Sequence, residues 1–133
     1  QIRVNNFSYG GLFLRMPYRA EKGGIALNSS GQYGAEAEGR PARWVGVEMP
    51  ICGREEMLSP SCSVIIMDHP SNSIYPTPWR VDGQLGIGPC RAIHESWDIK
   101  ESSTELFRHR IMITSGELYP DQIEESWDDF AVA

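Results

Sequence analysis

The segment that runs from residue 66 to residue 79 holds the side chains best suited to acid–base chemistry. Asp68 and His69 are adjacent at the end of an apolar run, and Asn72 follows in a loop that contains three prolines. Histidine exchanges protons near neutral pH, and a neighbouring carboxylate can orient its ring. We therefore expect Asp68 and His69 to be catalytic and Asn72 to bind a ligand. The alternative is that Asp68 caps the turn and His69 bonds to a backbone carbonyl.

Trp79 lies at the end of the same loop, directly after Pro78. Proline restricts the backbone on both sides of it, so the indole ring would be held still. The flat face of such a ring suits the C–H surface of a sugar. Trp79 is therefore a candidate ligand-binding residue, and the alternative is a core tryptophan beneath the loop.

Arginines in strand-like segments are a second group of candidates. Guanidinium groups form forked hydrogen bonds with carboxylates, and they also suit sugar hydroxyls. We select Arg15 and Arg43, with Glu36 as an acidic neighbour, as ligand-binding residues of a polar cleft. The alternative is that the arginines form structural ion pairs on a solvated sheet face.

The histidines and cysteines do not have the spacing of a metal site. The histidines are His69, His94 and His109, and the cysteines are Cys52, Cys62 and Cys90. They form no HxH, HExxH or CxxC motif, so we expect no metal and no cofactor. An odd number of cysteines excludes a full disulfide framework, and we expect free thiols. His109 lies between two arginines in a strand-like segment, which favours a surface position on a sheet face.

Strands separated by glycine- and proline-rich loops must position these residues. The candidate strands, of which we expect about seven to form, are Ile2–Phe7, Leu12–Met16, Ile25–Asn28, Ala42–Met49, Ser63–Asp68, Arg80–Val81, Leu85–Ile87 and Thr104–Thr114. The last element is a helix that starts at Pro120 and Asp121, because Ile123, Trp127 and Phe130 fall on one helical face. Strands without alternating helices predict a mostly β fold, an antiparallel β-sandwich with one C-terminal α-helix.

The composition describes an ordinary globular chain. With 133 residues it forms one β-rich domain, residues 1–133, and its formal net charge is −6. Nucleic-acid binders usually carry a basic stripe, so we expect no nucleic-acid partner. No apolar run approaches the roughly 20 residues that span a bilayer, so we expect no membrane span. We expect a soluble protein, either cytoplasmic or exported after removal of a signal.

Several motifs together resemble the PmoA-like family, which is catalogued as "methane oxygenase PmoA". They are Tyr9-Gly10-Gly11-Leu12 with Arg15-Met16-Pro17, Leu27 to Gly31, Ala42 to Val45, Met67 to Asn72, Pro76-Thr77-Pro78-Trp79, the strand from Leu106 to Ile113 and the Trp127 helix. The resemblance implies a supersandwich similar to the aldose-mutarotase group. It also implies that this chain corresponds to the C-terminal half of a longer domain. Pairing with the missing N-terminal half, or with a second copy, would then cover an open sheet edge.

Three functions follow as expectations. The first is a domain that binds or acts on a small polar ligand of the carbohydrate kind, in a cleft at the end of the sheet. The second is a non-catalytic structural or binding module that uses the same loop as a rigid scaffold. The third is the catalogue meaning of the resemblance, a copper-dependent oxygenase, although the chain has no clustered copper ligands.

Overall fold

A computed structural model describes residues 1–51, 60–84 and 86–133, and these form a mostly β protein with one α-helix. The central sheet is antiparallel, with strand order β3-β4-β5-β9. Its strands are β3 (Ile25–Asn28), β4 (Trp44–Pro50), β5 (Ser61–Asp68) and β9 (His109–Ser115). β5 is a run of mainly apolar residues with neighbours on both sides, as expected for a strand covered on both faces.

Among the described residues there are also two smaller antiparallel sheets. The first has the order β2-β7-β6, and the second pairs β1 with β8. Their strands are β1 (Ile2–Val4), β2 (Leu14–Arg15), β6 (Trp79–Asp82), β7 (Gly86–Pro89) and β8 (Trp97–Ile99). In the described part of the chain, three short 3-10 helices connect strands: η1 (Ala20–Lys22), η2 (Gly34–Ala37) and η3 (Arg91–Ile93).

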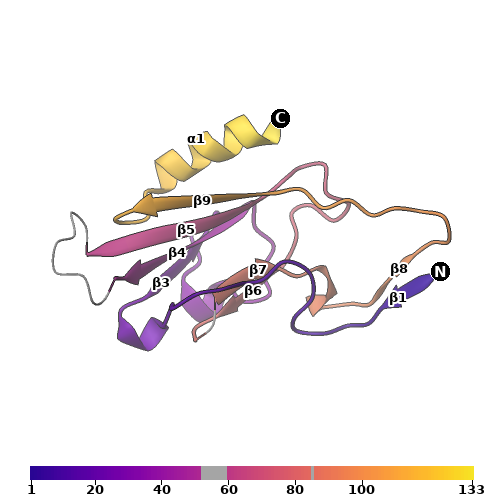
Figure 1. Ribbon diagram of the computed structural model, residues 1–133, viewed down its shortest axis with the longest axis horizontal. Helices are drawn as coiled ribbons and strands as arrows, with labels where there is room; N and C mark the ends of the chain where they lie inside the picture. Colours follow the sequence, from indigo (N-terminus) through magenta and orange to yellow (C-terminus); the bar gives the residue numbers. More distant parts are fainter. Residues whose placement is uncertain (52–59, 85) are drawn as a thin grey trace.

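The layers are sandwich-like, and Figure 1 shows β6 and β7 on one side of the central sheet and the helix α1 (Pro120–Ala131) on the other. Side chains alternate between the faces of a strand, so β4 and β5 supply both layers with apolar groups. Val45, Val47 and Ile66 pack with Trp79 and Ile87 of the β2-β7-β6 sheet. On the opposite face, the packed residues are Trp44, Ile65, Met67, Ile123 and Phe130. The expected antiparallel sandwich with one C-terminal helix is confirmed.

The strand expected at Thr104–Thr114 forms only from His109 onward. Its partner β5 ends at Asp68, where Pro70 turns the chain away. Beyond that point the Asn72 side chain takes the place of a partner strand, since it bonds to both the N–H and the C=O of Arg108. β8 was not expected from the sequence. Cys52, one of the expected free thiols, and Leu85, the first residue of an expected strand, lie outside the described residues.

The C-terminal helix has the expected start and the expected buried face. Pro120 occupies its first turn, and Ile123 and Phe130 are buried against the central sheet. Across the described ranges, no helix has the length and apolar character needed to cross a membrane.

Candidate functional site

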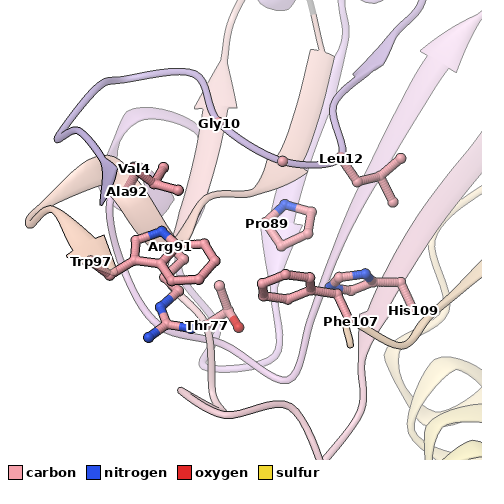
Figure 2. A pocket seen from close by; sticks show the side chains of 11 residues that line it. Val4, Gly10, Leu12, Thr77, Pro89, Arg91, Ala92, Trp97, Phe107 and His109 are labelled. Atoms are coloured by element: carbon pink, nitrogen blue, oxygen red, sulfur yellow. The ribbon is translucent and has the colours of Figure 1, made fainter. Parts of the chain in front are cut away.

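A pocket of about 440 Å³ lies where the two-stranded β1–β8 sheet meets the end of the central sheet (Figure 2). Its apolar walls include Leu12, Pro89, Trp97 and Phe107. Its polar side chains are Thr77, Arg91 and His109. In the view of Figure 2, Thr77 lies between the rings of Trp97 and Phe107. Segments from both ends of the chain therefore build this pocket.

The strand register places a carboxylate behind the histidine of this pocket. Asp68 is the cross-strand partner of His109 in the antiparallel pair β5–β9, so both side chains point to the same face. Nε2 of His109 lies 3.4 Å from Oδ1 of Asp68. This contact uses one ring nitrogen and leaves Nδ1 as the second atom that can exchange a proton.

Asp68 is fully buried and its two oxygens are shared among several donors. The Asn72 amide donates to Oδ1 at 2.6 Å, and the Thr77 backbone N–H donates to Oδ2 at 2.8 Å. Burial by itself raises the pKa of Asp68. Hydrogen bonds from His109, Thr77 and Asn72 outweigh it and hold the pKa below the ordinary value of 3.8. Asp68 is therefore ionised at neutral pH and can orient the His109 ring.

His69 lies on the opposite face of the sheet, because neighbouring residues of an extended chain alternate in direction. Nδ1 accepts a hydrogen bond from the Ser71 backbone N–H at 3.0 Å, and Nη1 of Arg108 lies 3.1 Å from Nε2. The ring packs edge-to-face on Phe130 of α1, with centroids 4.9 Å apart. Burial, followed by the charge of Arg108, lowers the pKa of His69. His69 thus connects the loop to the helix and does not line the pocket.

Asn72 and Trp79 are also inside the protein. The Asn72 side chain is 5% exposed and bonds to Asp68 and to the Arg108 backbone. The Trp79 side chain has no exposed surface, and its indole N–H donates to the carbonyl of Ala42 at 2.9 Å. No face of the Trp79 ring is therefore open to a ligand, so the ring has no surface on which a sugar could stack.

The remaining candidates lie apart from the pocket. Arg43 donates to Glu124 of α1 at 2.7 Å, and its guanidinium lies 5.0 Å from the centroid of the Trp127 ring. Arg15 on β2 and Glu36 on η2 are both exposed. The structure therefore does not bring the predicted residues into one cleft. Asp68 does not line the pocket itself, but it contacts two residues that do, His109 and Thr77.

The residues that line the pocket were missed because their sequence signals are weak. Strand alternation places His109 on the same face as Phe107, and pairing of the two strands that contain Asp68 and His109 sets these side chains opposite each other. The alternation is visible in the sequence, whereas the pairing that brings His109 to Asp68 is a property of the folded sheet. Trp97 lies in a three-residue strand that no sequence pattern indicated. Arg91 follows β7 in a short 3-10 helix.

Within the described ranges, no group of three or more His, Cys, Asp or Glu side chains could hold a metal ion. Cys62 and Cys90 are free thiols, and Cys52 is outside these ranges. The expectations of no metal and no cofactor stay predictions.

Comparison with known proteins corrects the family assignment. The model of DUF6807, described as a family of unknown function, matches residues 1–128. Searches of the curated proteins and of the solved structures found no match. The resemblance to the PmoA-like family is therefore wrong, and the copper-oxygenase and mutarotase-like expectations lose the resemblance on which they rested. Since the family model covers nearly the whole chain, this chain belongs to DUF6807, a family of unknown function.

Proposed function

We propose that this domain binds a small carbohydrate-like ligand in the pocket lined by Phe107 and His109. The observation that carries the proposal is the combination of aromatic walls and hydrogen-bonding groups around one cavity of about 440 Å³. Pockets that hold small molecules usually measure about 300–1,000 Å³ and combine apolar walls with a few polar groups.

The two aromatic rings of the pocket suit the C–H faces of a sugar. Phe107 is 43% exposed, so its ring is accessible to a ligand. It packs edge-to-face on Trp97, with centroids 5.9 Å apart and planes at 74°. This contact orients the Phe107 ring before a ligand arrives, which reduces the entropy lost on binding.

The polar groups of the pocket suit hydroxyls, which both donate and accept hydrogen bonds. Nδ1 of His109 accepts when the ring is neutral, with the Nε2 proton directed at Asp68. The Thr77 hydroxyl donates to Asp68, and its oxygen keeps the capacity to accept from a ligand hydroxyl. Proton transfer at Nδ1 would make this an enzyme-type site, with Asp68 stabilising the charged ring.

A non-catalytic binding module is the second candidate. It is favoured by the separation of Asp68 and His69, the pair expected to exchange protons, onto opposite faces of the sheet. In that case the loop from residue 69 to residue 78 serves to support the fold, and the pocket binds without chemistry.

The test is titration of the protein with a panel of neutral and acidic monosaccharides, followed by NMR of the His109 ring and by calorimetry. We expect shifts of the His109 ring signals on binding. Phe107→Ala should weaken binding about tenfold, because it removes an accessible ring at little cost to the core. Proton transfer is tested with the unchanged protein, by following ligand proton exchange in the NMR spectra, and its absence on a bound sugar would favour the binding module.

The matched control is Tyr33→Ala, which removes an aromatic ring that is 58% exposed and lies outside this pocket. We expect it to leave sugar binding unchanged. Absence of binding to every sugar of the panel, or an equal loss in both variants, would overturn the proposal.

A further inference from the structure

The ionisable side chains that line the pocket are basic, although the chain as a whole is acidic. The protein carries a formal net charge of −6. Among the described residues that line the pocket, the ionisable side chains are Arg91 and His109, and no aspartate or glutamate is included. A cavity lined by one sign of charge attracts ligands of the other sign.

Two carboxylates, Asp68 and Glu105, lie beside these groups, but neither lines the pocket. The buried carboxylate of Asp68 lies behind His109 and is taken up by donors from Asn72 and Thr77. The flanking arginines of His109 are directed elsewhere. Arg108 lies against His69, and Arg110 donates to Asp129 of α1 at 2.8 Å.

Arg91 is held in place by the Trp97 ring, by Ser73 and by an ion pair with Glu105. Its guanidinium carbon lies 3.8 Å from the centroid of the Trp97 ring, which fixes the plane of the group. Nη1 donates to Ser73 at 2.9 Å and lies 3.5 Å from Glu105. In the described part of the chain, these hydrogen bonds use Nη1 alone, so the forked geometry that suits a carboxylate is not consumed.

We infer that the ligand of this pocket is an acidic sugar, a polyhydroxy compound of the uronate kind. Its carboxylate contacts the guanidinium of Arg91, its hydroxyls contact His109 and Thr77, and its C–H surface lies on Phe107. This inference rests on the proposed function, because it names the ligand class of the same pocket.

The test compares D-glucuronate with D-glucose, which differ at one position, a carboxylate in place of a hydroxymethyl group. Calorimetry should give D-glucuronate about tenfold tighter binding than D-glucose. Added salt should weaken the binding of D-glucuronate and leave that of D-glucose unchanged, because salt screens only the charged contact. Arg91→Gln should bring the two affinities together while D-glucose still binds.

The matched control is Arg3→Gln, which removes the same charge from an arginine that also has a 3.5 Å ion pair, with Asp98, but does not line the pocket. It should keep the preference for D-glucuronate. If Arg91→Gln does not fold, the salt dependence of the unchanged protein still decides. Equal affinity for the two sugars, or equal loss in both variants, overturns the inference and leaves the proposed function standing. Failure of both sugars and of the rest of the panel overturns the proposed function itself.

Discussion

Asp68 is the residue on which both the loop and the pocket depend. Its buried carboxylate accepts hydrogen bonds from the Asn72 amide and the Thr77 backbone, and it faces Nε2 of His109. A buried charge is tolerated only when donors replace the water that it loses. The same group therefore fixes the proline-rich loop and positions the only histidine that lines the described pocket.

Asp68→Asn should destabilise the protein by about 1–3 kcal/mol at neutral pH, because a buried donor would then face an amide N–H group. The folded pKa lies below the ordinary value of 3.8, so the carboxylate adds stability above that value. This stability is lost as the pH falls through the lower, folded pKa. Urea denaturation at about pH 7 and about pH 3 should show the gap between the two proteins narrowing in acid.

The control for this substitution is Asp98→Asn. Asp98 is exposed and forms a 3.5 Å ion pair with Arg3, and surface ion pairs of this kind contribute little, so its loss should cost less than about 0.5 kcal/mol. A gap between Asp68→Asn and the unchanged protein that is the same in acid and at neutral pH would contradict the role given to the Asp68 charge.

At the scale of elements, the segment just before the short strand β2 lies very close to β7. A Cβ atom added at Gly88 would collide with the backbone carbonyl of Leu12 and would lie 2.8 Å from Cα of Phe13. The neighbouring backbone cannot give way as the end of a flexible side chain would. Glycine at this position therefore lets the segment that carries Leu12, a wall of the pocket, lie against β7.

Gly88→Ala should destabilise the protein by about 1–3 kcal/mol through overpacking. The matched substitution is Gly83→Ala, where the new Cβ would meet Cβ of Ala20 at an ordinary 3.5 Å. We expect that change to stay within about 0.5 kcal/mol. Thermal denaturation of both variants measures the difference, and equal midpoints would show that the segment carrying Leu12 and Phe13 can move away from β7 at no cost.

At the scale of the whole molecule, the β2-β7-β6 sheet covers only part of the central sheet. Ile66 on β5 has no exposed surface, whereas Ile113 on β9 is 71% exposed. Both residues point to the face that carries β6 and β7, because Ile66 pairs with Ile111 and strand residues two apart share a face. β6 and β7 therefore leave the β9 edge of this face uncovered.

Ile66→Ala should cost about 2–5 kcal/mol, because it leaves a cavity between two packed layers. Ile113→Ala removes the same atoms from an exposed site and should change stability by less than about 0.5 kcal/mol. Equilibrium denaturation in urea gives both values. A large loss for Ile113→Ala would mean that β9 is covered in solution.

Pairing with a second copy, and membership of a longer domain, stay predictions.

Local patterns in the sequence were sufficient for the fold class and for the C-terminal helix. The spacing of Ile123 and Phe130 predicted the buried helical face, and the apolar run before Asp68 predicted the central strand. Such patterns work because the period of a helix or a strand assigns side chains to faces without reference to the rest of the chain. The strand expected from Thr104 began later because its length depends on where β5 turns away.

The sequence by itself determined that Asp68 stands at the end of a buried strand and that a stiff loop follows it. The tertiary structure alone decided which histidine faces this carboxylate. His69 is the neighbour along the chain, but successive strand residues point to opposite faces, so it packs against α1. His109 is the neighbour across the β5–β9 ladder, and register between distant segments is set by the pairing of whole strands. The candidate site therefore follows from the register of the sheet, which no local pattern contains.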